Sequence, residues 1–308
     1  MTARVVDIHA HVIVPGLGAD VAWEDGAQVV RFAGKEIRAA VREFADLEGI
    51  LAEQDRAGVD LVVLCPWVNL VGREPERQNE ALVQMAGERV AVLGTVDLKR
   101  PDALAELMRD GRLAGVEVAA SVGGDYLGHE RFRDFWAAAE ETQALVFVHP
   151  TTRGFDLPVF DDYYLWNAVG NPVETTITAA HMVMAGVFEA HPRLRIVLAH
   201  AGGAVLALRG RLRHAHSFQP QARARLRESP EDSLRRFHYD TLTHDAGLLR
   251  QVVEFAGADR VLCGSDYPFD MGLERPAEPV RALGLSAEEE SAILGGNALC
   301  LLGQEASS

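Results

Sequence analysis

Short apolar runs rich in β-branched residues alternate with amphipathic stretches through nearly the whole chain. Each run has the length of a strand, and most are followed by a helical pattern, which predicts repeated strand–helix units. Eight runs are expected to form strands; they are residues 5–9, 59–65, 90–94, 115–118, 145–149, 194–200, 237–240 and 260–264. The weakest of these patterns is Phe237-His238-Tyr239-Asp240.

Helical patterns fill most of the intervals between the strands. The first is expected to begin after a cap at Asp46 and to end at Gly58, since Asp accepts backbone N–H bonds and Gly tolerates a left-handed conformation. Pro101 is typical of a first helical turn. Further helices are expected near 76–88, 129–142, 173–188 and 203–216. Residues 12–44 carry several glycines and charges, and are expected to form an irregular insertion after strand one.

Eight strand–helix units in one chain favour an α/β protein built as a single (β/α)₈ TIM barrel. No low-complexity linker or internal repeat interrupts the pattern, so residues 1–308 are expected to be one domain. A doubly wound sheet is the alternative fold. It lacks support, because no strand leads into a Gly-rich nucleotide-binding turn.

Composition narrows the classes of partner. The 308 residues are 48% hydrophobic, which suits a globular protein with a substantial core. They include 30 basic and 45 acidic residues, a net charge of −15, which disfavours nucleic acid and anionic membranes as partners. The expected partner is a small-molecule substrate, and an anionic one would need arginines of its own at the site.

Cysteine usage and the first residues bear on the cellular compartment. Cys65, Cys263 and Cys300 are far apart and odd in number, which indicates reduced thiols rather than a disulfide framework. Met1 to Arg4 run directly into the first strand pattern with no secretory signal, and no apolar stretch has transmembrane length. A cytoplasmic protein is expected.

Candidate metal ligands stand where predicted strands end. His9 and His11 end the first strand, two positions apart, so their rings are expected to point the same way. His149, His200 and Asp266 follow strands five, six and eight. Taken singly, each fits a loop, cap or turn residue. The carboxyl ends of barrel strands share one mouth, however, so together they predict a site for Zn²⁺ or a similar ion with one position left for water.

The segments around these residues resemble the decarboxylase branch of the amidohydrolase superfamily. The motifs are Asp7-Ile8-His9-Ala10-His11, Phe147-Val148-His149-Pro150, Ala199-His200-Ala201-Gly202-Gly203 and Gly264-Ser265-Asp266-Tyr267-Pro268-Phe269. The likeness runs from about residue 4 to 303 and is densest across 145–270. Within this branch, the sequence is most similar to enzymes that decarboxylate a carboxymuconate semialdehyde.

The resemblance implies roles for individual residues. His9, His11, His149 and Asp266 would bind one Zn²⁺, with Mn²⁺ as an alternative. His200 would act as a base toward the metal-bound water, and Asp266 or His200 would pass a proton. Arg38 would hold a substrate carboxylate, and Arg211 would enter the site of a neighbouring subunit, which makes the expected unit a homodimer.

The sequence departs from the family on the substrate side. A family tryptophan aligns with Asn167, while Trp166 stands one position earlier, so both are candidate substrate-binding residues. The loop 66–71 after strand two also differs, which leaves the substrate open. Arg38 in its charged segment, and Arg211 between Arg209 and Arg213, also fit solvated surface positions.

These features predict a metal-dependent, non-oxidative decarboxylase acting on a small unsaturated or aromatic carboxylic acid. The main alternative is a hydrolase, such as a lactonase or amidohydrolase, and a hydratase of a related acid also fits the same residues. No lysine ends the strand 115–118, where binuclear hydrolases of this superfamily often carry a bridging carboxylated one, which favours a single metal. A non-catalytic metal-binding protein is a third possibility.

Overall fold

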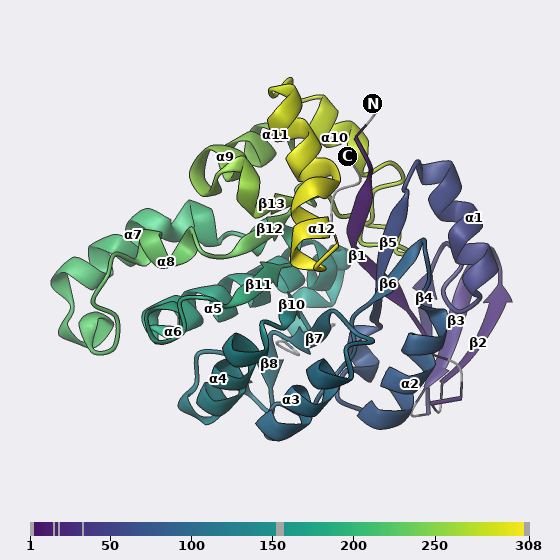
Figure 1. Ribbon diagram of the computed structural model, residues 1–308, viewed down its shortest axis with the longest axis horizontal. Coiled ribbons are helices and arrows are strands. Elements are labelled where there is room, and N and C mark those ends of the chain that lie inside the picture. The colour runs from purple at the N-terminus through teal and green to yellow at the C-terminus, as the bar shows by residue number, and fades with distance from the viewer. Residues whose placement is uncertain (1–2, 15, 18, 33, 152–156, 305–308) are drawn as a thin grey trace.

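The computed structural model describes residues 3–14, 16–17, 19–32, 34–151 and 157–304, and in these ranges it is an α/β protein with parallel sheets at its centre (Figure 1). Every strand expected from the sequence is present. The parallel strands are β1 (Val6–Val12), β5 (Leu61–Pro66), β6 (Val90–Val92), β7 (Gly115–Ala119), β10 (Leu145–His149), β11 (Arg195–Leu198), β12 (His238–Asp240) and β13 (Val261–Leu262). The α/β prediction is therefore confirmed.

The parallel strands pair in two sheets that follow the order of the chain. One sheet has the order β1-β5-β6 and the other β13-β12-β11-β10-β7. Backbone contacts also join the outer strands of the two sheets. Ile8 N donates to Cys263 O at 2.9 Å, and single parallel bridges link Ala10 with Tyr267 and Gly94 with Val116.

Side chains alternate between two apolar clusters along the strands. On β5, Val62 and Leu64 pack in the large cluster that includes the surrounding helices. Leu61, Val63 and Cys65 belong to a second cluster that includes Leu299 of the C-terminal helix. Period-two alternation of wholly apolar strands is expected where both faces of a parallel sheet are covered.

Helices surround the strands (Figure 1). The α-helices are α1 (Leu47–Ala57), α2 (Pro75–Met85), α3 (Pro101–Asp110), α4 (Arg133–Thr142), α5 (Asn171–Met184), α6 (Val187–Ala190), α7 (Val205–Phe218), α8 (Pro230–Leu234), α9 (Ala246–Ala256), α10 (Ala277–Arg281), α11 (Ala287–Ser291) and α12 (Asn297–Leu301). The predicted limits of α1 are confirmed: Asp46 accepts from Gly49 N, and Gly58 ends the helix at φ 73°. Within the described ranges, none of these helices is both long and apolar enough to cross a bilayer.

The segment 12–44 is more regular than its sequence indicated. It contains an antiparallel sheet of β2 (Ala19–Glu24), β3 (Ala27–Phe32) and β4 (Lys35–Ala40), at the right of Figure 1. Asp25 and Gly26, at φ 48° and 75°, form the two-residue turn between β2 and β3. Asp-Gly is a strong signal for this turn, and the expectation of an irregular insertion was wrong because glycine was interpreted only as a loop residue. A short second ribbon pairs β8 (Ser121–Val122) with β9 (Asp125–Tyr126).

The buried imidazole of His238 predicts a loss of stability in acid. The side chain begins β12, is 6% exposed, and has Arg260 Nη1 3.3 Å from its Nε2. Burial and the Arg260 charge lower the pKa of His238 from 6.5 to about 4. The unfolded chain therefore takes up this proton between about pH 6.5 and 4 while the folded chain does not, so the free energy of unfolding falls by about 3 kcal/mol over that range.

Urea unfolding of wild type and His238→Gln between pH 7 and 4 measures this contribution. The wild-type free energy of unfolding should decline more steeply than that of the variant. His214→Gln, a substitution of an exposed histidine on α7, should follow the wild type. Parallel wild-type and His238→Gln curves would contradict the assignment.

Candidate metal centre

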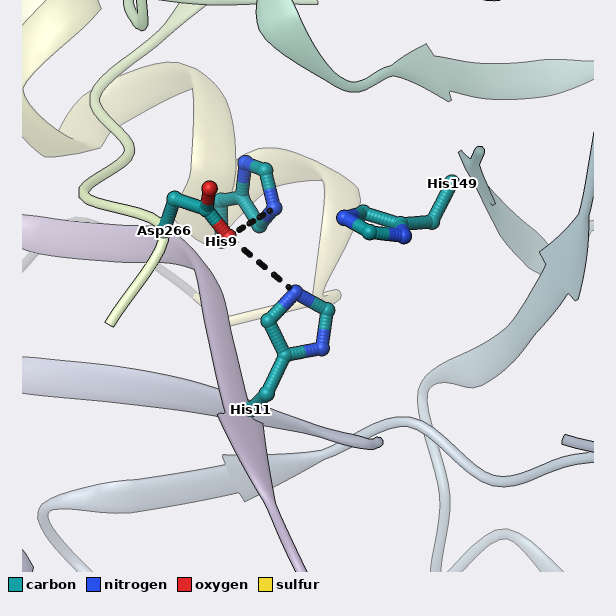
Figure 2. Close-up of side chains that lie close together, drawn as sticks. All are labelled: His9, His11, His149 and Asp266. Carbon is teal, nitrogen blue, oxygen red and sulfur yellow. Dashed lines mark ion pairs between the residues drawn. The ribbon is translucent and has the colours of Figure 1, made fainter. Parts of the chain in front are cut away.

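Four buried side chains from three distant segments meet at one point, and Figure 2 shows them directed toward one another. His9 and His11 come from β1, His149 from the end of β10, and Asp266 from the loop after β13. One ligand atom from each lies within 4.8 Å of the other three. The structure thus brings together the four residues predicted to bind metal.

β1 contains a bulge next to its two histidines. Asp7 pairs with Val62 but Ala10 pairs with Leu64, so β1 carries one more residue than β5 across this step. His9 Nε2 and His11 Nε2 nevertheless both face Asp266 Oδ1, at 3.2 and 3.5 Å. The two side chains converge as expected from their spacing, although the strand is irregular between Asp7 and Ala10.

The ring nitrogens are arranged for metal binding through Nε2. His9 Nδ1 lies 2.6 Å from Asp240 Oδ2, and His149 Nδ1 lies 2.9 Å from Pro150 O, so each Nδ1 has an acceptor for its proton. Within the described residues, the Nε2 atoms of His9, His11 and His149 are buried without a hydrogen bond. Three imidazole nitrogens and a carboxylate oxygen are a donor set that suits Zn²⁺, and the orphaned atoms face the centre of the group.

Charge within the group depends on burial and on Asp266. Burial disfavours protonation of His9, but the carboxylates of Asp266 and Asp240 outweigh it and raise its pKa to about 10. Burial acts against the charged form of Asp266 too, yet His9 and the neighbouring imidazoles hold its pKa well below the usual range. Burial lowers the pKa of His149 well below 6.5. The cluster therefore holds one carboxylate and favours a positive charge beside it.

His200 lies next to this group but outside it. It follows β11 in a 3₁₀ turn over His200–Gly202, and its Nε2 is 3.5 Å from Asp266 Oδ2. The Nε2 atoms of His9 and His11 face Oδ1 of the same carboxylate, so the two oxygens of Asp266 face different histidines. The rings of His200 and His9 are 5.4 Å apart. His200 is therefore a neighbour of the four-residue group and not one of its members.

Two buried carboxyl groups behind the histidines were not predicted as site residues. Asp240, the last residue of β12, contacts His9. Glu117 of β7 lies 3.7 Å from His11 Nδ1, and burial raises its pKa well above 4.5. Asp240 ends the seventh strand, so the strand-end rule that found the ligands would have found it too. Glu117 lies within the apolar run 115–118, where a single charged residue is itself a signal.

A third buried carboxylate joins the first and last parallel strands. Asp7 Oδ1 accepts from Ser265 N at 2.9 Å and from His9 N at 3.1 Å, and Asp7 Oδ2 accepts from the Ser265 hydroxyl. Asp266 N in turn donates to His9 O at 2.8 Å. These bonds fix the loop that carries Asp266 against β1.

The predicted substrate residues lie farther out. Trp166 and Asn167 are half-buried in the turn before α5, and the Trp166 ring packs against Tyr164 at 5.0 Å. Tyr164 in turn donates its hydroxyl to Asp270 at 2.9 Å. Arg38 is exposed on β4, where its guanidinium donates to Asp25 O at 3.3 Å, and Arg211 is exposed on α7. The ligand group found among the described residues contains none of these four.

Comparison with known proteins decides the family. Residues 6–304 match the model of the amidohydrolase family. The chain belongs to the amidohydrolase family. The family expected from the sequence motifs is therefore confirmed.

Relatives of this amidohydrolase include 2-amino-3-carboxymuconate-6-semialdehyde decarboxylases. The one from Dictyostelium discoideum is 31% identical over 194 residues, which cover 62% of this chain and only about half, 54%, of that protein. The one from Caenorhabditis elegans is 24% identical over an alignment covering 97% of this chain and 94% of that protein. Because this alignment covers nearly the full length of both proteins, the likeness extends beyond the motifs of the candidate metal ligands.

A solved structure shows the same fold. It is 5-carboxyvanillate decarboxylase from Novosphingobium aromaticivorans, complexed with manganese and 4-hydroxy-3-methoxy-5-nitrobenzoic acid. Its TM-score with this chain is 0.82 at 18% identity, covering 98% of this chain and 96% of the other. The α/β architecture with parallel sheets is thus shared over nearly the whole length of both chains.

Removal of one predicted ligand tests the centre. His149→Ala should weaken Zn²⁺ and Mn²⁺ binding by at least about 100-fold, beyond the effect usual for residues that only orient a ligand. Metal analysis after gel filtration and competition with a chelator measure this. Zn²⁺ should also raise the Tm of the wild type but not that of His149→Ala.

His181→Ala is the matched control, since this histidine is exposed on α5 and lies outside the group. It should bind metal as the wild type does. Wild-type affinity in His149→Ala would remove His149 from the ligand set.

Proposed function

We propose that the chain is a metal-dependent, non-oxidative decarboxylase of a small aromatic or unsaturated carboxylic acid. One observation carries the proposal: His200 lies against the outer oxygen of Asp266, whose inner oxygen faces the metal-binding nitrogens. This arrangement couples a metal position to a group that can exchange a proton. The decarboxylases among the relatives and solved structures support the same reaction.

We propose that His9, His11, His149 and Asp266 hold one Zn²⁺ or Mn²⁺. The nitrogen-rich donor set supports Zn²⁺, and the manganese in the 5-carboxyvanillate decarboxylase structure supports Mn²⁺. When bound, such an ion would supply Lewis acidity for a substrate oxygen and would lower the pKa of a water ligand.

The reaction requires a proton at the carbon that loses CO₂. As the carbon–carbon bond breaks, its electron pair stays on the substrate, that carbon takes up a proton, and the carboxylate leaves as CO₂. We propose His200 as the group that delivers this proton, since an imidazole can change its charge near neutral pH. Asp266 Oδ2, 3.5 Å from His200 Nε2, would share the proton and hold the ring toward the substrate.

Substrate binding is proposed for Arg38, Arg211, Trp166 and Asn167. A guanidinium binds a carboxylate through two parallel hydrogen bonds, which suits Arg38 or Arg211. Trp166 connects to the site through Tyr164 and Asp270, whose neighbour Phe269 lies 5.4 Å from the His11 ring. An aromatic wall on this side suits a planar, unsaturated acid.

We propose that Arg211 acts across a homodimer. It lies on α7, which extends away from the sheets at the left of Figure 1. Two apolar side chains of the same helix, Leu208 and Phe218, are 40% and 67% exposed. Exposed apolar side chains on an extended helix support a protein partner over this surface.

The finer architecture follows from the same residues. We propose that residues 1–308 form one domain and that the two parallel sheets close into a (β/α)₈ barrel. The bond from Ile8 N to Cys263 O and the bridge between Gly94 and Val116 support closure at both edges. Metal ligands at the ends of strands one, five and eight would then share the mouth of the barrel.

The test of the function is CO₂ release. Zn²⁺- and Mn²⁺-loaded protein is incubated with carboxymuconate semialdehydes and hydroxybenzoates, including 5-carboxyvanillate, and CO₂ and the decarboxylated product are quantified. At least one acid should be converted. His200→Ala should keep its metal and lose about 100-fold or more in kcat on that acid, as expected when a proton-transfer group is removed.

A hydrolase is the outcome that would overturn the proposal. Metal-loaded protein would then release no CO₂ from any acid but would cleave lactones, esters or amides. Loss of metal in His200→Ala would instead make His200 a ligand and would remove it from the proton-transfer role.

Mixing inactive variants tests the position of Arg211. Arg211→Ala and His200→Ala should each be inactive alone. After subunit exchange the mixture should regain about a quarter of wild-type activity, because half of the dimers are mixed and each contains one complete site. Arg213→Ala is the control: Arg213 lies on the same helix as Arg211 but forms an ion pair with Glu231 of α8 at 2.8 Å, so it should not be needed. A mixture no more active than its parts would place Arg211 outside its neighbour's site.

A further inference from the structure

The carboxylate of Asp240 connects the metal group to the loop that carries His200. It is fully buried at the end of β12 and accepts four hydrogen bonds. Oδ2 accepts from His9 Nδ1 at 2.6 Å and from His200 N at 2.9 Å. Oδ1 accepts from Ala201 N at 2.7 Å and from Leu242 N at 3.1 Å. Both oxygens are therefore occupied only by donors.

The backbone that Asp240 holds is in an unusual conformation. His200 and Ala201 have φ angles of 54° and 51°, in the left-handed region that residues with a side chain rarely adopt. Such conformations persist only where surrounding bonds determine them. Here the N–H groups of both residues donate to the Asp240 carboxylate. No neutral side chain offers the same four acceptor sites.

The same carboxylate sets the tautomer of a metal ligand. An Nδ1–H on His9 that donates to Asp240 leaves the lone pair on Nε2, which faces the metal group. A carboxylate partner also makes the imidazole a stronger donor toward a metal. Orientation of the ligand and orientation of His200 thus depend on one side chain.

We propose that Asp240 is a positioning residue that fixes His9 for metal binding and His200 for proton transfer. The part concerning His200 rests on the proposed function, whereas the part concerning His9 requires only that the four-ligand group binds metal. Asp240 is not one of the four candidate ligands, so its effect is exerted through these two residues.

The amide of Asp240→Asn tests the proposal with little change in shape. One carboxylate oxygen becomes an NH₂ group, which faces donors and cannot accept from them. Zn²⁺ affinity, measured by chelator competition, should fall about 10–100-fold. At saturating metal, kcat should also fall while KM stays near the wild-type value, because the substrate contacts are unchanged.

Asp245→Asn is the matched control. Asp245 is exposed at the start of α9, where its carboxylate accepts from Leu248 N, so the same substitution removes a similar backbone contact outside the site. Its metal affinity and kcat should equal those of the wild type. Wild-type metal affinity in a folded Asp240→Asn would overturn the proposal for His9, and an unchanged kcat at saturating metal would overturn it for His200.

A measurement on the wild type does not depend on the folding of the variant. In the Zn²⁺-loaded protein, long-range ¹H–¹⁵N correlation spectra should show a His9 ring with its proton on Nδ1 and slow exchange of that proton with water. A His9 proton on Nε2 would overturn the proposal. Neither this spectrum nor the metal affinity requires decarboxylase activity, so a failure of the proposed function is distinguished from a failure of this inference.

Discussion

The structure depends on a negative charge kept out of water. Asp266 is 4% exposed, and its carboxylate faces three imidazoles from β1 and from the turn after β11 at 3.2 to 3.5 Å. A charge in such surroundings is tolerated only where opposite charge or hydrogen bonds compensate for the lost water. The compensation comes from residues whose own positions are set by backbone pairing between distant strands. Pairing of the strands therefore fixes the position of the Asp266 charge, and the chemistry of the site depends on that position.

Carboxylates behind the ligands extend this constraint inward. Asp7 ties the Asp266 loop to β1 through Ser265, and Asp240 holds His9 and the turn at His200. Glu117 lies behind His11 at 3.7 Å. The site therefore has an inner layer of acidic groups behind the imidazoles, and of these Asp240 bonds an imidazole directly. Carboxylates behind imidazoles fix the orientation of the rings, so the candidate ligands are positioned before a metal would bind.

Local patterns predicted the strands and the convergence of the four candidate ligands well, because a strand end is visible in sequence and its direction is shared by all parallel strands. His149 and Asp266 were found by this rule despite their separation. The bulge in β1 was not predictable, since it depends on pairing with Val62 and Leu64 in another segment. Asp240 was overlooked because its short strand has a weak pattern, and its contacts with His9 exist only after folding.

The antiparallel sheet β2–β3–β4 shares an apolar cluster with residues that lead to the candidate site. Its core includes Phe44 and Trp67, Phe44 packs on Phe269 at 5.5 Å, and Phe269 lies beside His11. The antiparallel sheet therefore lies behind Phe269, whereas the four candidate ligands come from β1, the end of β10 and the loop after β13. A substitution at Val30 or Phe44 would therefore act on the surroundings of His11 through Phe269 and leave the four candidate ligands unchanged. The shape beside the ligand group and the ligand group itself then depend on different segments of the chain.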